Sequence, residues 1–272
     1  MFSNLCPGAV GLGGPMADVL SLAKAVGFEG VDPNLGEPVE ETRALYEELG
    51  LRVGTAGLPV DFRGEECKYE QGMAGLVDFA GRMQGVGATR CATWLLPFSD
   101  ELTYQENFDL HVRRLKPAAQ LFAAHGIRLG LEFVGTPSLR GGKAHEFVHT
   151  LTQVLELCAA IGGDNVGLLL DAWHWYTSHG TVEELRQLTN DDIVLVHVND
   201  APAGIEIDEQ LDNVRDLPGE TGVIDLPTFM GVLKEIGYDG PVSPEPFCQR
   251  LNDLERRARA EAVANSLKGI MP

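Results

Sequence analysis

The stretch LLLDAWHWY (168–176) runs from three leucines into an acid, a histidine and three large aromatic residues. A continuous apolar run of this kind is typical of a strand buried on both faces, as in a parallel sheet that is covered by helices. Taken alone, the stretch also fits a simpler interpretation, in which Asp171 caps a helix and His174 is a hydrogen-bonded core residue. The remainder of the chain distinguishes the two.

Apolar segments alternate with segments of helical period from one end of the chain to the other. The candidate strands are residues 4–10, 28–33, 51–59, 89–97, 127–135, 165–173, 192–200 and 240–247. Amphipathic stretches lie between them, and several end in glycine, the residue expected just beyond a helix. Eight strand–helix units favour closure into a barrel, and 272 residues is a usual length for one such barrel.

We therefore expect an α/β protein with a single (β/α)8 TIM barrel domain over residues 1–272. An open dinucleotide-binding sheet would carry G-x-G-x-x-G after an early strand, and GLGGP (11–15) lacks that spacing. The longest irregular segment, residues 201–225, lies between the last two candidate strands. Loops of that length in compact domains tend to be functional.

Charge and cysteine content argue against several classes of protein. With 21 Lys plus Arg against 40 Asp plus Glu, the formal charge is −19, which repels nucleic-acid phosphates. The five scattered cysteines include no C-x-x-C pair and fit a reducing cytoplasm. No apolar run approaches the ~20 residues of a membrane span. We expect a cytoplasmic protein without nucleic-acid or membrane partners, and we allow for a homo-oligomer.

Four consecutive candidate strands end in a potential metal ligand, namely Glu132, Asp171, His197 and Glu245. The C-terminal ends of the strands in a parallel barrel meet at one mouth, where the chemistry takes place. Three carboxylates buried there would lose hydration and repel one another, a cost that a divalent cation removes. A ligand set without thiolate suits a harder ion, with Mn²⁺ our first choice and Mg²⁺, Co²⁺ or Zn²⁺ as alternatives. Each residue taken singly also fits a salt bridge or a cap.

The motifs around these residues resemble the xylose isomerase-like barrel superfamily, the sugar phosphate isomerase/epimerase group with its ketose 3-epimerases, inosose dehydratases and hydroxypyruvate isomerases. The resemblance extends over essentially the whole chain and is carried by LGLEFVG, LLLDAWHWY, VLVHVND, RDLPGETGVID and GYDGPVSPEPF. It implies that the metal is held by Glu132, Asp171, His197 and Glu245. It also implies that Glu132 and Glu245 act as catalytic acid and base, and that His174 and Arg215 contact the substrate.

Other residues near the predicted mouth bear on the substrate. Trp94 and Trp173 could form apolar walls against a sugar ring, although aromatic residues more often belong to the core. Some ketose 3-epimerases have a further glutamate six residues after the first metal ligand, where this chain has Ser138. Arg140 or Lys143 could replace that contact. No glycine-rich helix start or basic cluster follows the last two strands, so we expect a nonphosphorylated substrate.

The resemblance implies a divalent-metal-dependent isomerase or 3-epimerase, which moves a proton next to the carbonyl of a ketose or polyol ketone through an enediolate. A lyase, such as an inosose dehydratase or an enzyme that eliminates from 3-keto-glycosides, is the first alternative because it begins with the same proton abstraction. A non-catalytic sugar-binding barrel is less favoured, since both candidate acid–base glutamates are present. An apurinic endonuclease on this barrel would need additional histidines, which the third and fourth candidate strands lack.

Overall fold

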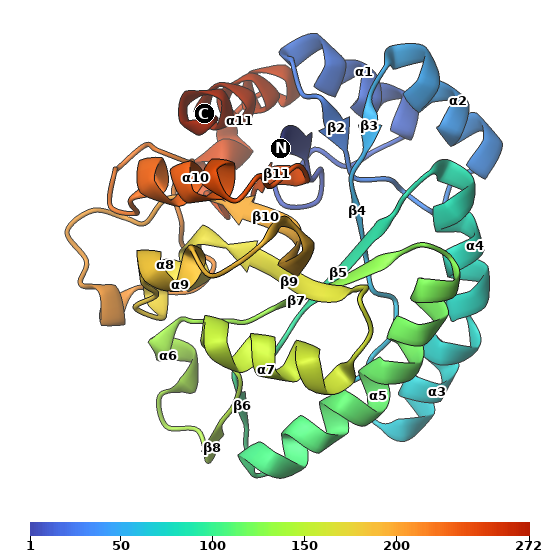
Figure 1. Cartoon of the computed structure of the whole chain (residues 1–272). Coiled ribbons are helices and arrows are strands. Elements are labelled where there is room, and N and C mark those ends of the chain that lie inside the picture. Colours follow the sequence, from blue (N-terminus) through green and yellow to red (C-terminus); the bar gives the residue numbers. More distant parts are fainter.

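The computed structural model describes residues 1–272 and shows a parallel sheet surrounded by helices (Figure 1). The sheet order is β3-β2-β1-β11-β10-β9-β7-β5-β4. The strands are β1 Phe2–Leu5, β2 Gly30–Val31, β3 Arg52–Val53, β4 Thr55–Gly57, β5 Arg90–Trp94, β7 Arg128–Glu132, β9 Val166–Asp171, β10 Ile193–Val198 and β11 Pro241–Pro244. A separate antiparallel pair is formed by β6 Phe98–Ser99 and β8 His145–Glu146.

One segment of the chain closes the barrel. β3 and β4 stand at opposite ends of the sheet order, yet only Gly54 separates them in sequence. A Cβ on Gly54 would overlap the side chains of Asp32 and Asn4, so glycine is needed where the strand is interrupted. The strands therefore occupy eight positions around the barrel, each overlapping a candidate strand of the sequence. The predicted (β/α)8 barrel is confirmed.

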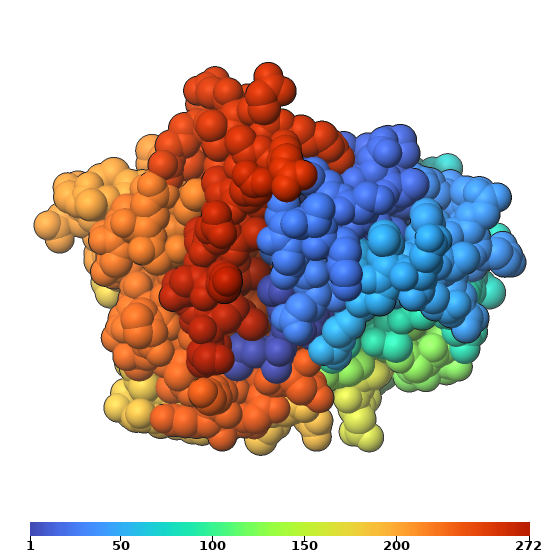
Figure 2. Space-filling view, turned by 90° about the horizontal axis from the view of Figure 1, so that it is seen from above, coloured from blue at the N-terminus to red at the C-terminus, as the bar shows by residue number.

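The helices pack on the outside of the sheet (Figure 1). They are α1 Met16–Val26, α2 Val39–Leu49, α3 Glu66–Ala74, α4 Leu76–Val86, α5 Tyr104–Ala124, α6 Pro137–Arg140, α7 Leu151–Ile161, α8 Ala172–Thr177, α9 Val182–Leu185, α10 Leu226–Glu235 and α11 Arg256–Ile270, with 3-10 helices η1 Asn190–Asp192, η2 Ile207–Glu209 and η3 Gln249–Asp253. None combines the length and the apolar character that crossing a membrane requires. The first and last parts of the chain lie side by side (Figure 2), because β1 pairs with β11 and α1 packs on α11.

Local sequence signals set the ends of several helices. α1, α2 and α4 end at Gly27, Gly50 and Gly87, whose φ angles of 97°, 60° and 85° lie in the left-handed region that glycine adopts without strain. α5 begins at Thr103, whose hydroxyl accepts a hydrogen bond from the Glu106 N–H, while the Glu106 carboxylate accepts one from the Thr103 N–H. These ends position the loops that follow the strands.

The strand register aligns the side chains at the barrel mouth. Asp171 on β9 pairs with His197 on β10, and alternate residues of a strand face the same side of the sheet. Leu169 and Leu195 therefore lie one layer below Asp171 and His197, where they form a small buried cluster with Ala92 of β5. This apolar layer supports the mouth from inside the barrel, separately from the larger core between sheet and helices.

We expect Leu195→Ala to lower the free energy of unfolding by about 2–5 kcal/mol, because truncating a buried leucine removes apolar burial and leaves a cavity. Val77→Ala on α4, where the side chain is 57% exposed, is the matched control and should change stability by less than about 0.5 kcal/mol. Urea unfolding followed by circular dichroism measures both. Equal losses would show that Leu195 is not part of a packed interior.

Candidate metal centre

The structure brings together the four predicted ligands at the C-terminal ends of their strands. Glu132 ends β7, Asp171 ends β9, His197 lies one residue before the end of β10, and Glu245 follows β11. One ligand atom from each residue lies within 4.8 Å of all the others. The first three side chains are buried and Glu245 is half-buried, so the cluster is largely shielded from solvent.

Hydrogen bonds hold the Asp171 carboxylate in one orientation. Its Oδ1 accepts from the Trp173 backbone N–H at 2.8 Å and from the Asn199 side-chain amide at 2.9 Å, while its Oδ2 accepts from Arg215 at 2.8 Å. Asn199, which is fully buried, was not among the predicted site residues. The sequence did contain a signal for Asn199, because it lies two residues after His197 at the end of the same strand. This spacing puts both side chains on one side of the sheet.

Two buried atoms of the cluster lack a hydrogen-bond partner, Oε1 of Glu132 and Nδ1 of His197. They lie 3.8 Å apart, and Nδ1 of His197 lies 3.4 Å from Oε2 of Glu245. Buried polar atoms are normally paired, and a bound cation would satisfy both of these. The donor set of three carboxylates and one imidazole therefore fits a divalent metal ion, without favouring one of the candidate ions over the others.

The electrostatics of the cluster are asymmetric. Burial and the neighbouring Glu245 carboxylate raise the pKa of Glu132 well above its usual value. Burial also favours a higher pKa for Glu245 and Asp171, but nearby positive groups outweigh it. His197 lowers the pKa of Glu245, and Arg215 lowers the pKa of Asp171. These carboxylates overcome the burial of His197 and raise its pKa to about 9. Positive charge thus allows the acids to be buried together.

Arg215 is one source of that charge. The side chain is only 4% exposed, and its guanidinium donates to Asp171, to Glu245 at 3.1 Å and to Asp212 at 3.0 Å. Arg215 is therefore a buried part of the cluster and not a surface residue that pairs with Asp212 alone. Its Cζ also lies 5.1 Å from the Trp173 ring and 4.9 Å from the Phe247 ring, which places it between two aromatic side chains.

The long loop after β10 carries Arg215 and holds it in place. The Asp200 carboxylate organises this loop by accepting backbone hydrogen bonds from Thr221, Gly222 and Ile224 at 2.8–3.0 Å. The backbones of Asp200 and Asp216 also bond each other in an isolated bridge. Arg215 therefore rests on an ordered part of the loop.

His174 lies in α8, which begins directly after Asp171. The backbone N–H of Gly135 donates to Nδ1 of His174 at 3.2 Å. Nε2 lies 3.3 Å from the Arg215 guanidinium and 4.0 Å from both Glu132 Oε1 and Asp171 Oδ2. Burial lowers the pKa of His174 to about 4. A neutral histidine therefore faces the cluster beside Arg215.

The two predicted tryptophans have different surroundings. Trp94 ends β5 in register with Glu132, is 45% exposed, and has the Arg63 guanidinium 3.8 Å from its ring centre. Trp173 is fully buried and donates to the Thr136 hydroxyl at 3.0 Å. The structure thus places Trp94 beside the mouth and Trp173 behind Arg215, and their contact with a substrate stays a prediction.

Ser138, which stands at the position of the missing glutamate, has a partner outside the cluster, and so do the two residues considered as substitutes, Arg140 and Lys143. Ser138 donates to the Gln210 carbonyl at 3.1 Å, and Arg140 donates to the Gly135 carbonyl at 2.7 Å. Lys143 donates to Asp100 at 3.0 Å. None of the three contacts the ligand cluster directly.

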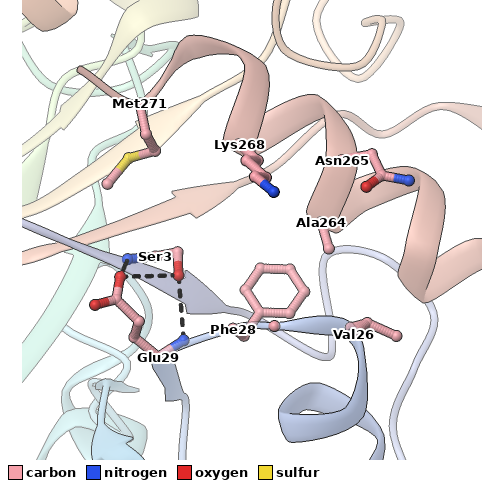
Figure 3. Close-up of a pocket in the computed structure, with 9 residues that line it drawn as sticks. Ser3, Val26, Phe28, Glu29, Ala264, Asn265, Lys268 and Met271 are labelled. Atoms are coloured by element: carbon pink, nitrogen blue, oxygen red, sulfur yellow. Dashed lines mark hydrogen bonds between the residues drawn. The ribbon is translucent and has the colours of Figure 1, made fainter.

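Figure 3 shows a separate pocket of about 330 Å³ between α1 and α11. Two of its lining residues mark its level in the barrel, since Ser3 lies early in β1 and Glu29 directly precedes β2. The pocket therefore opens at the N-terminal ends of the strands, opposite the ligand cluster. Its carboxylate, Glu29, already accepts hydrogen bonds from the backbone and hydroxyl of Ser3. Function in such barrels is expected at the other end.

Comparison with known proteins adds to this geometry. The model of the family "Xylose isomerase-like TIM barrel" matches residues 20–270. An inosose isomerase from Bacillus velezensis is 36% identical over 126 residues, 45% of this chain and 41% of that protein. A 3-dehydroshikimate dehydratase from Pseudomonas aeruginosa is 28% identical over 270 residues, 95% of this chain but 40% of that protein. Matches to these curated relatives thus span about two fifths of their length.

A solved structure resembles the whole chain. It is that of a xylose isomerase domain protein from Alicyclobacillus acidocaldarius, which is 29% identical and superposes with a TM-score of 0.89 over 100% of this chain and 98% of that one.

We expect the protein to bind one divalent ion, and His197→Asn to weaken binding of that ion by more than about 100-fold. Losing a direct ligand should cost more than the 10–100-fold that is usual for an outer-shell partner such as Asn199. Calorimetric titration of the chelator-treated protein with MnCl2, and with Mg²⁺, Co²⁺ and Zn²⁺ salts, measures the affinity and stoichiometry. His149→Asn, at a half-buried histidine outside the cluster, is the control and should bind like the wild type. Equal affinity of both variants would contradict the ligand role of His197.

Proposed function

Because this chain belongs to the xylose isomerase-like TIM barrel family, we propose that it is a divalent-metal-dependent isomerase or 3-epimerase that acts on a nonphosphorylated ketose or polyol ketone. The observation that carries the proposal is the convergence of four donor atoms within 4.8 Å at the mouth of the barrel. The name of the inosose isomerase relative supports a polyol ketone as substrate.

The ion, Mn²⁺ as our first choice, would be held by Glu132, Asp171, His197 and Glu245. When bound, it would supply Lewis acidity towards the carbonyl oxygen and a neighbouring hydroxyl oxygen of the substrate. The chain's own task is then to hold the substrate next to two proton-transfer groups and to keep water away from them. The largely buried cluster supports this.

The strand order separates the two glutamates. Neighbouring strands in this part of the sheet follow the order β11, β10, β9 and β7. Glu245 and Glu132 therefore stand on either side of His197 and Asp171. A substrate held over the two inner residues would therefore be flanked by carboxyl groups. One glutamate can remove the proton next to the carbonyl and the other can return a proton to the opposite face.

Arg215 and His174 would stabilise the negative charge that develops on the substrate oxygens. Arg215 is positioned by Asp171, Glu245 and Asp212, and these acids outweigh its burial and raise its pKa further, so it remains charged. The Nε2 atom of His174 faces the cluster beside the Arg215 guanidinium. Donors fixed before the reaction stabilise such charge without further reorganisation.

A lyase is the second candidate, and a specific observation favours it. The match to the 3-dehydroshikimate dehydratase extends over 95% of this chain, whereas that to the inosose isomerase covers 45%. Elimination of water β to a carbonyl begins with the same proton abstraction. The two reactions differ in whether the second proton goes to carbon or to the departing hydroxyl group.

We expect the manganese-loaded protein to exchange the proton next to the substrate carbonyl with deuterium from D2O, and Glu245→Gln to slow this exchange by about 10²–10⁴-fold, the usual contribution of a general base. Proton NMR on a panel of free ketoses, inososes, 3-keto-glycosides and 3-dehydroshikimate measures the exchange. A dehydrated product with a newly conjugated or aromatic ring, recognised by a change in ultraviolet absorbance, would identify the lyase.

Glu48→Gln is the matched control, because Glu48 lies exposed on the outer helix α2 and should exchange at the wild-type rate. Wild-type exchange by Glu245→Gln would rule out the base role of Glu245. No exchange by the wild type on any member of the panel would favour a sugar-binding barrel without turnover.

A further inference from the structure

A second cavity, of about 360 Å³, opens at the half of the barrel mouth that contributes none of the four candidate ligands. It is lined by the residues that follow β1 and β2 and by β4, including Cys6, Asp32, Asn34 and Thr55. No lysine, arginine or histidine lines it. The lining therefore offers carboxylate, hydroxyl and thiol groups, while the guanidinium next to it, that of Arg256, is already bonded to the carbonyls of Leu12 and Gly13.

The strand register places this cavity at the level of the ligand cluster. Ser3 of β1 pairs with Val242 of β11, so continuing the register sets Cys6 beside Glu245. The hydrogen bond from Asn4 to Ser243 at 2.8 Å, one layer lower, shows that the two strands remain in register. Leu5 pairs with Val31, which in turn sets Asp32 beside Cys6.

Asp32 thus lies two strand spacings, about 10 Å, from Glu245 along the mouth. That span is of the order of one sugar molecule. The carboxylate belongs to the same layer of the barrel as the metal ligands but faces the opposite part of a bound substrate.

The Asp32 carboxylate is held mainly through one of its oxygens. Oδ1 accepts hydrogen bonds from the Asn4 side-chain amide at 2.8 Å and from the Thr55 backbone N–H at 2.7 Å. These bonds fix the orientation of the carboxylate, and the absence of a side chain at Gly54 leaves it room. The neighbouring Cys6 thiol also interacts with the carboxylate. No N–H group bonds Oδ2, so this oxygen can accept a hydrogen bond from a ligand in the cavity.

Thr55 supplies the second, independent observation. The residue is 6% exposed and lines the cavity, and its hydroxyl is buried without a hydrogen-bond partner beside the backbone N–H that bonds Asp32. A buried hydroxyl without a partner costs free energy unless something bound pairs with it. A ligand hydroxyl can both accept from Thr55 and donate to Asp32.

We propose that Asp32 and Thr55 form a subsite for the hydroxyl-bearing end of an uncharged polyol ketone whose carbonyl end lies at the metal cluster. The inference rests on the proposed function and specifies its substrate class. A carboxylate or phosphate at this end is disfavoured, because it would face the Asp32 charge without a compensating cation. The subsite therefore distinguishes a neutral inosose or free ketose from 3-dehydroshikimate, which is an anion.

The test is calorimetric binding of two ketones to the manganese-loaded full chain. Inosose carries ring hydroxyls, and dihydroxyacetone lacks the distal ones. Asp32→Asn keeps the Oδ1 acceptor but replaces Oδ2 with a donor, so we expect inosose to bind about 10–100-fold more weakly while the affinity for dihydroxyacetone is unchanged. 3-Dehydroshikimate should bind the variant at least as tightly as the wild type.

Thr55→Val is the second variant, since it keeps the shape of the side chain and removes a hydroxyl that bonds nothing in the protein. It should weaken inosose binding several-fold with no loss of thermal stability. Asp61→Asn, at a residue that bonds only the nearby Gly64 N–H, is the matched control and should bind inosose like the wild type.

Equal inosose affinities of the wild type, Asp32→Asn and Thr55→Val would overturn the subsite, as would a wild type that does not bind inosose at millimolar concentration. The deuterium exchange of the same samples separates this inference from the proposed function. If both variants bind inosose normally and still exchange deuterium, only the subsite is refuted. If inosose binding depends on Asp32 but no ketone exchanges deuterium, only the proposed catalysis is refuted.

Discussion

The burial of three carboxylates in one small cluster is the constraint on which the rest of this structure depends. Glu132, Asp171 and Glu245 repel one another and lose hydration, so the fold has to supply positive charge at the same place. It does so with Arg215, which donates to two of them, and with His197, whose pKa they raise to about 9. A divalent cation would meet the same demand, which is why the cluster fits a metal.

The strands and the four candidate ligands could be predicted because their signals are local. An apolar run indicates a buried strand, and a single polar residue at its C-terminal end, as at Glu132 or Asp171, points to the mouth of a parallel barrel. Residue pairs that meet only after the chain has folded gave no such signal. The burial of Arg215 against Trp173 and Phe247 depends on a loop whose course is set by backbone bonds to Asp200.

Asp32 shows a different limit of sequence reasoning. It follows a strand just as Glu132 does, yet an aspartate followed by proline also fits an ordinary turn. What distinguishes it is the pairing of β1 with both β2 and β11, a contact between the two ends of the chain. The interruption at Gly54 is equally invisible in sequence, because the need for glycine arises from the side chains of Asp32 and Asn4 on neighbouring strands.

The proposed site is compatible with either of the two reactions that the names of the relatives suggest, isomerisation and dehydration. Under the proposed function, the ligand cluster would determine which proton becomes acidic, since only the carbon next to a carbonyl held at the cluster would be activated. The fate of that carbon would then depend on which substrate hydroxyl lies opposite the flanking glutamates and near His174. That depends on where the far end of the substrate is held, so groups on the other half of the mouth, Asp32 and Thr55 among them, would control the reaction outcome without taking part in the proton transfer.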